Sequence, residues 1–200
     1  MNEDLRDDWL RSKIEKDLPE VNPAKFIIAQ APGNDSLVGL TLGDIRKMYS
    51  LKSTKEALTK LMTVTNLQAT IFYENINESL VEKALRSRRS LVASNAASFR
   101  ENNRFKILKP ERATSTFTKF LSLSEKENLM SKEDAIEKIT KVPAEKLGLK
   151  NRGLIKEGYI ADLVGLKENN VNFVVLNGKV VVEDGKITGL RAGKILRHKI

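Results

Sequence analysis

Two dipeptides near the C-terminal end constrain the fold of this chain more than any other feature. Asn177-Gly178 and Asp184-Gly185 flank the β-branched run Val180-Val181-Val182. Asn, Asp and Gly tolerate the positive φ angles that a two-residue type I′ turn demands, so each dipeptide predicts a hairpin. We therefore expect antiparallel strands across residues 161–188, with no helix in this part of the chain. The expected strands cover residues 162–164, 173–176 and 180–182.

The first hundred residues show a different pattern, in which short apolar runs alternate with stretches of helical spacing. Ser53 and Glu56 form the signature of a capping box before one such stretch. Strand, helix, strand, helix, strand at this spacing predicts parallel βα units. The expected strands are residues 26–29, 69–73 and 90–95, and the expected helices lie at residues 42–49, 53–62 and 80–85.

Residues 111–150 read as helical. Phe117, Phe120 and Leu121 begin an amphipathic stretch, and Ser131 with Asp134 marks another capping box. Pro143 falls in the first turn of a further helix, and Gly148 stands where a C-cap glycine belongs. The boundary between the βα part and the β-rich part therefore falls near residue 150.

Composition excludes several classes of protein. The 200 residues are 40% apolar, which is enough for one ordinary domain with a small annex. No run approaches the ~18 apolar residues of a membrane helix, and the first residues are acidic where a secretory signal would be basic. The absence of Cys excludes disulfides and thiolate metal sites. We expect a soluble, cytoplasmic protein that does not bind membranes.

The net charge of +9 raises nucleic-acid binding as a rival function. Most Lys and Arg residues, however, alternate with Asp and Glu along the expected helices, which is typical of solvated faces. The locally basic runs lack interleaved aromatic residues and match no binding motif. We do not expect a nucleic-acid partner. The basic runs are residues 86–89, 104–109 and 191–199.

The last fifty residues carry a resemblance that extends, more weakly, over most of the chain. Residues 151–164 and 174–185 resemble the closing segment of a metal-dependent amidohydrolase. Within that superfamily the chain resembles the C-terminal portion of the N-acyl-D-amino-acid deacylases, or D-aminoacylases. Four stretches support this resemblance: residues 39–45, 91–95, 109–117 and 131–197. Where this chain has residues 91–95, the family's strand ends in Gly-Ser-Asp-Gly. Where it has residues 109–117, the family reads His-Pro-Arg and then Gly-Thr-Phe.

The resemblance implies an α/β architecture in two parts. Family members fold as a TIM-like (β/α)₈ barrel that carries a small β-sandwich built from both chain ends. Residues 1–150 would be the last few βα units of a partial barrel, and residues 151–200 would be the C-terminal share of the sandwich. A partial barrel leaves a strand edge unpaired, so we expect as partner either an N-terminal barrel half or further copies of this chain.

The same resemblance implies hydrolysis of a C–N amide bond other than a peptide bond, with zinc as the cofactor of the complete enzyme. We expect no cofactor in this chain, because its single histidine, His198, has no second ligand nearby. Asn95 occupies the position of the family's catalytic Asp, and an amide cannot accept the proton. Arg112 could bind a substrate carboxylate, or could be a loop arginine paired with a neighbouring acid. Asp162 is structural in the family.

Three functions remain open at this point. The chain is a fragment or split half of a deacylase-like hydrolase and inactive alone, which we favour. Otherwise it is a degenerate family member that acts as a binding or regulatory module, or an unrelated basic protein that interacts with nucleic acid. A neighbouring reading frame that encodes the start of a barrel would separate the first from the second. Retention on heparin at elevated salt would support the third.

Overall fold

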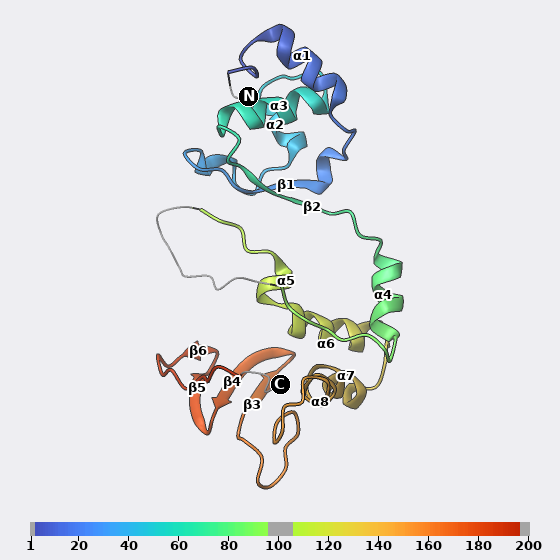
Figure 1. Ribbon diagram of the computed structural model, residues 1–200, viewed down its shortest axis with the longest axis vertical. Coiled ribbons are helices and arrows are strands. Elements are labelled where there is room, and N and C mark those ends of the chain that lie inside the picture. Colours follow the sequence, from blue (N-terminus) through green and yellow to red (C-terminus); the bar gives the residue numbers. More distant parts are fainter. Residues whose placement is uncertain (1–2, 96–105, 197–200) are drawn as a thin grey trace. The chain divides into compact units, whose positions relative to one another are not determined.

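The computed structural model describes residues 3–95 and 106–196, which form two compact units. The first contains residues 3–76 and 106–110, and the second contains residues 77–95 and 111–196. Both mix helices and strands (Figure 1). Throughout these residues, no helix combines the length and apolar character needed to cross a membrane. The expected boundary near residue 150 separates barrel from sandwich material and remains a prediction.

In the first unit, helices pack beside a two-stranded sheet. Strands β1 (Phe26–Gln30) and β2 (Thr70–Tyr73) pair antiparallel, with Phe26 opposite Tyr73. The rings of these two residues are in contact, 5.7 Å apart between centroids. The helical elements are α1 (Asp8–Asp17), α2 (Leu42–Met48) and α3 (Thr54–Val64), with short 3₁₀ turns η1 (Pro23–Lys25) and η2 (Asp35–Leu37).

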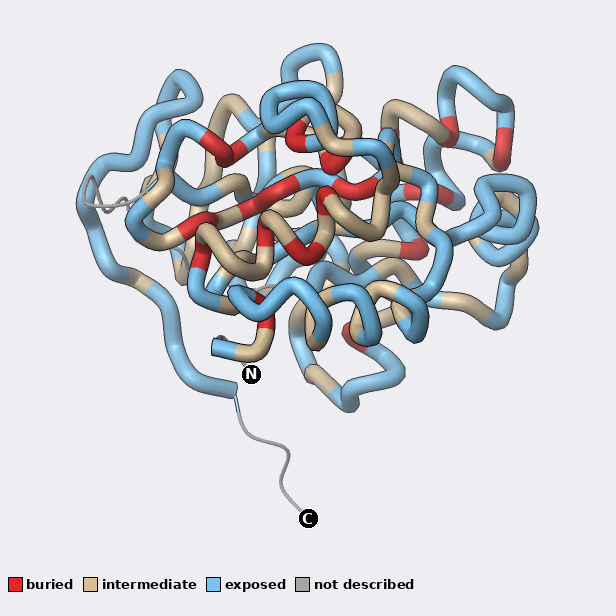
Figure 2. Tube along the Cα trace, turned by 90° about the horizontal axis from the view of Figure 1, so that it is seen from above, coloured by how far each residue is buried: buried red, intermediate tan, exposed pale blue. Residues whose placement is uncertain are grey.

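The core of the first unit lies where β1, α2 and α3 meet. Ile28, Leu42 and Ile45 are completely buried, and Leu61 is 2% exposed. Figure 2 shows the buried positions of the chain in red. Side-chain caps define where both helices begin. Thr41 and Asp44 form a reciprocal capping box at α2, and the Ser53 hydroxyl accepts the Glu56 N–H at 3.1 Å at the start of α3. The hydrogen bonds from Thr41 lower the pKa of the Asp44 carboxyl.

The expected parallel βα units are wrong for this part of the chain. Two helices, α2 and α3, lie between β1 and β2, so the chain reverses direction once more than in a βα unit and the strands pair antiparallel. The third expected strand, residues 90–95, is not a strand. Its apolar residues can pack, as Val92 does, but an extended segment becomes a strand only beside another strand that takes its hydrogen bonds.

The helices of the second unit surround a small core of Phe120, Leu121 and Ala135. Two basic side chains join the end of α4 to the other helices. The Arg86 guanidinium donates to the carbonyls of residues 127–129 at 3.1–3.2 Å, and the Lys138 ammonium donates to the Ser87 carbonyl. Burial lowers the pKa of Lys138. The helices are α4 (Glu78–Arg86), α5 (Glu111–Thr114), α6 (Thr116–Lys126), α7 (Lys132–Ile139) and α8 (Lys141–Lys146).

The predicted antiparallel strands of the second unit are confirmed. They form a meander in the order β3, β4, β5, β6 (Figure 1). Asn177-Gly178 and Asp184-Gly185 are its tight turns, with φ between 48° and 76° at all four residues. A further turn of this kind, Glu168-Asn169, was not predicted because neither residue is glycine. The strands are β3 (Leu163–Lys167), β4 (Asn170–Leu176), β5 (Lys179–Glu183) and β6 (Lys186–Ile187).

The connection between α8 and β3 contains glycines at positive φ. Gly148 ends α8 as predicted, with φ 65°, and the Leu149 N–H donates to the Ala144 carbonyl at 2.8 Å. Gly153, with φ 82°, lies so close to α8 that an added Cβ would be 2.7 Å from the Ala144 Cβ and 2.9 Å from the Thr140 carbonyl oxygen. Position 153 therefore needs glycine for two independent reasons.

Gly153→Ala should destabilise the second unit more than Gly158→Ala does. Both glycines have positive φ, near 80°, which costs a residue with a Cβ about 1–2 kcal/mol. Only at position 153 does the new methyl group also overlap its neighbours, which adds about 1–3 kcal/mol, whereas nothing lies within 4 Å of the Cβ at 158. Urea unfolding of the two variants measures the difference, and equal losses would contradict the packing against α8.

Candidate functional site

The structure brings the two candidate site residues, Asn95 and Arg112, together through their backbones. The Asn95 N–H donates to the Arg112 carbonyl oxygen at 3.3 Å. Asn95 ends the extended segment that begins at Leu91, and Arg112 lies in the short helix α5. The backbones of residues separated by seventeen positions thus meet at one point of the second unit.

The Arg112 side chain is free to bind an anion. It is exposed, and its guanidinium pairs with no acid in residues 3–95 and 106–196. The adjacent acid, Glu111, pairs instead with Lys119 across one face of the helical segment. The Arg112 carbonyl is fixed, because it also accepts a hydrogen bond from the Thr116 hydroxyl at 2.6 Å. A fixed backbone with a free guanidinium suits bidentate pairing with a carboxylate.

The Asn95 side chain is exposed, and within the described residues its amide has no hydrogen-bond partner. A carboxamide at this point can orient a polar group by donating from its nitrogen or accepting at its oxygen, but it does not titrate. It therefore supplies no general base. The assignment of Asn95 and Arg112 to a catalytic site remains a prediction.

The donors needed for a metal centre do not converge in the part of the chain that the structure describes. No three His, Cys, Asp or Glu side chains come together there as potential ligands. His198 falls outside the described residues. Tight zinc sites use three or four such ligands, so these residues do not fit the metal that the family uses.

The Asp162 carboxylate, in the segment 151–164, is engaged in contacts that stabilise the fold. One carboxylate oxygen pairs with the Arg152 guanidinium, and the other accepts the Asn177 N–H at 2.8 Å. Both side chains of the ion pair are largely buried, 14% exposed for Arg152 and 26% for Asp162. The Gly178 N–H donates to the Ala161 carbonyl at 2.9 Å beside it. Asp162 thus ties the connection after α8 to the β4–β5 turn. Sequence reasoning missed Arg152 as its partner.

Comparison with known proteins connects this architecture to one family. A model of the amidohydrolase family matches residues 45–181. No curated protein matches. Among solved structures, a D-aminoacylase described as defining a novel subset of amidohydrolases is 26% identical, with a TM-score of 0.64. The match covers 84% of this chain and 36% of that one.

Two further structures agree. A D-aminoacylase mutant in complex with copper chloride is 26% identical, with a TM-score of 0.66 over 86% of this chain and 37% of its own. An N-acyl-D-glutamate deacylase from Bordetella bronchiseptica, complexed with zinc and a phosphonate mimic of the tetrahedral intermediate, is 20% identical, with a TM-score of 0.59 over 78% of this chain and 34% of its own. This chain spans little more than a third of the length of these proteins.

We expect the purified chain to hold no stoichiometric zinc, because it has one His and no Cys, and because no group of three His, Cys, Asp or Glu side chains converges within the part that the structure describes. Elemental analysis after extensive dialysis against metal-free buffer measures the zinc content per chain. A His198→Ala variant provides the control, since it removes the one imidazole and should leave the result unchanged. One tightly held zinc per chain, lost in that variant, would contradict our assignment of the site.

Proposed function

Because this chain belongs to the amidohydrolase family, we propose that it is the C-terminal part of a metal-dependent enzyme that hydrolyses the amide bond of N-acyl-D-amino acids. The observation that carries the proposal is the match to D-aminoacylase, which is 26% identical over 84% of this chain. The match covers 36% of that enzyme, so the remaining share of such an enzyme has no counterpart here. Alone, the chain is catalytically incompetent.

In this proposal, residues 1–150 contribute the last βα units of a TIM-like barrel and residues 151–200 contribute strands to a β-sandwich. The meander of β3 to β6 supports the second part, because antiparallel strands with tight turns are the usual material of a sandwich. Helices α4, α6 and α7 beside the extended segment at residues 91–95 support the first. The antiparallel pairing of β1 with β2 is the departure from a regular barrel unit.

The residues of this chain would act on the substrate rather than on the metal. Arg112 would bind the carboxylate of the acylated amino acid, since its exposed guanidinium is not engaged by an acid in the described residues. Asn95, which meets Arg112 through the backbone, would orient the substrate near that carboxylate. The metal and its ligands would have to come from elsewhere, because the potential ligands among residues 3–95 and 106–196 do not converge to hold a metal.

A partner follows from the same reasoning. Strands β2, β3 and β6 each present an edge that pairs with no other strand among the described residues, whereas the outer edge of β1 is covered by residues 39–41. Unpaired edges bind further strands. We propose that an N-terminal barrel half completes the fold, with a homo-oligomer of this chain as the alternative.

A second candidate function is that of a binding or regulatory module that has lost catalysis. The identity of residue 95 favours this second candidate, because an amide stands at the position where the resembled family has an acid. Under this alternative the chain would keep the carboxylate-binding role of Arg112 without the reaction. The two candidates differ in whether restoring the acid restores turnover when the missing half is present.

Asn95→Asp should therefore have different effects in two settings. In the isolated chain it should give no deacylase activity, because no activated water is available to deprotonate. Assembled with a family N-terminal half that carries the metal ligands, the same substitution should raise turnover of N-acyl-D-amino acids by ~10²–10⁴.

Asn95→Ala provides the matched control, since it changes the side chain at the same position without supplying a carboxylate and should not raise turnover. Steady-state assays on the unmodified chain, Asn95→Asp and Asn95→Ala, each alone and assembled with the N-terminal half, decide the matter. Metal-dependent deacylase activity from the unmodified isolated chain would overturn the proposal. No gain from Asn95→Asp in an assembly shown to be formed would favour the binding module instead.

A further inference from the structure

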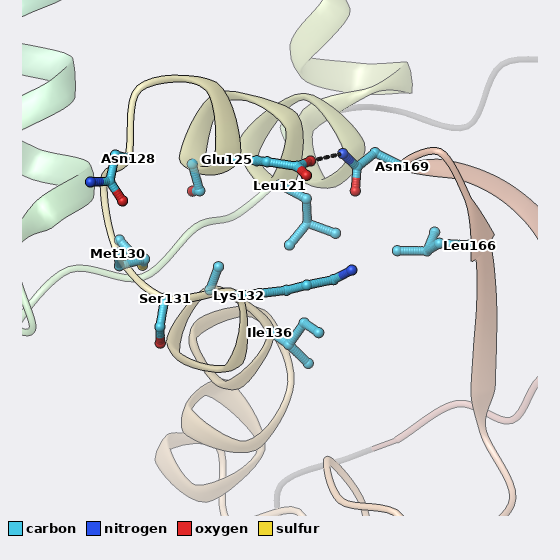
Figure 3. Close-up of a pocket in the computed structure, with 11 residues that line it drawn as sticks. Leu121, Glu125, Asn128, Met130, Ser131, Lys132, Ile136, Leu166 and Asn169 are labelled. Carbon is cyan, nitrogen blue, oxygen red and sulfur yellow. Dashed lines mark hydrogen bonds between the residues drawn. The ribbon is translucent and has the colours of Figure 1, made fainter.

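A cavity of about 260 Å³ opens within the second unit, between α6, the beginning of α7 and the turn that joins β3 to β4 (Figure 3). It is distinct from the Asn95–Arg112 contact, because neither of those residues lines it. A cavity of this volume is large enough for a small metabolite.

One wall of the cavity is apolar. Leu121 from α6, Ile136 from α7 and Leu166 from β3 point toward one another across it (Figure 3). Leu121 is 9% exposed, and Ala135, which lies beneath it, is 1% exposed. A branched aliphatic group would remove these surfaces from water.

Opposite charges line the same cavity without pairing with each other. The Lys132 side chain points into the cavity from the beginning of α7 (Figure 3), and no acid among the described residues pairs with its ammonium. Glu125 on α6 accepts a hydrogen bond from the Asn169 amide at 2.8 Å through one carboxylate oxygen, Oε2. Its other oxygen, Oε1, remains available. The cavity therefore presents one cation and one anion to whatever enters it.

A buried hydroxyl without a partner lies between these features. Ser124 is 3% exposed and lines the cavity, yet its Oγ makes no hydrogen bond within the described residues. Buried polar groups in proteins nearly always have a partner, so an unpaired one calls for an explanation. The Oγ atom itself has essentially no solvent-accessible surface, so a ligand in the cavity would reach the hydroxyl only after the Ser124 side chain rotates.

We propose that this cavity binds a free α-amino acid with a branched aliphatic side chain. The carboxylate would pair with Lys132 and, after the Ser124 side chain rotates, accept from its hydroxyl. The ammonium would pair with Glu125, and the side chain would lie on Leu121, Ile136 and Leu166. Leucine is small enough to enter a cavity of this volume. A ligand with a single charge would leave either Glu125 or Lys132 without an opposite charge. The inference does not depend on the proposed function.

The test compares leucine, each enantiomer separately, with its two singly charged analogues. 4-Methylpentanoate lacks only the amino group, and 3-methylbutylamine lacks only the carboxylate. Binding to the full chain is measured by NMR titration of the backbone amides of residues 121–136 and 166–169. At least one enantiomer should bind about tenfold or more tightly than either analogue, because each charge-assisted pair is lost in one of them.

Three variants make the test specific. Glu125→Gln keeps an oxygen for the Asn169 amide and removes only the charge, and Lys132→Gln removes the opposite charge; each should weaken leucine binding about tenfold. Lys146→Gln, on the exposed surface of α8, is the control and should change nothing. Circular dichroism establishes that each variant is folded. Three results would each overturn the inference. Leucine and its two analogues could bind with equal affinity, or leucine binding could be unchanged in both charge variants. The third is that about 20 mM leucine shifts none of these amide signals.

Discussion

The stability of a β-strand depends on neighbours that take its backbone hydrogen bonds, and the distribution of such neighbours determines most of this structure. In the C-terminal meander every strand from β3 to β6 has at least one partner, and the turns are at the dipeptides that favour them. Elsewhere partners are scarce. Strand β1 pairs with β2 and forms an isolated bridge to Thr41. Residues 91–95 have no regular secondary structure and pair with no described strand. The second unit instead fixes Asn95 through its single hydrogen bond to Arg112.

The same scarcity bears on chemistry. A hydrolytic site at the end of barrel strands requires several strands to deliver side chains to one place. Here only the backbones of Asn95 and Arg112 are seen to meet within the described residues. Arg112 retains a free guanidinium, but Asn95 does not titrate, and no cluster of metal-binding side chains forms in the described residues. Asp162, which lies within the segment that resembles the family's closing motif, is engaged by Arg152 and by the Asn177 N–H. Its role is to hold the β4–β5 turn against the connection from α8.

Sequence reasoning identified the local features and failed on long-range ones. The turns at Asn177-Gly178 and Asp184-Gly185 and the Gly148 C-cap depend on a few adjacent residues and are confirmed. The Ser53 and Ser131 hydroxyls cap their helices, but the full capping boxes predicted there are not described, and the reciprocal pair occurs at Thr41 and Asp44. The direction in which β2 pairs with β1 depends on the path of some forty intervening residues, which periodicity does not determine. Contacts such as Arg152 with Asp162, or Lys132 beside Glu125 in one cavity, likewise arise only from packing. The Asn95–Arg112 contact joins residues that the sequence had selected for separate reasons.

We propose that residues 91–95 form a barrel strand once a neighbouring strand is supplied. Hydrogen exchange of the Leu91–Ser94 amides, measured on the chain alone and after mixing with an N-terminal half of an amidohydrolase, tests this proposal most directly. Our account predicts rapid exchange alone, because these four amides have no backbone partner among the described residues, and strong protection on mixing, as the missing strand takes their hydrogen bonds, while the amides of β4 remain protected throughout. Complex formation that left these four amides exchanging as rapidly as before would contradict the account.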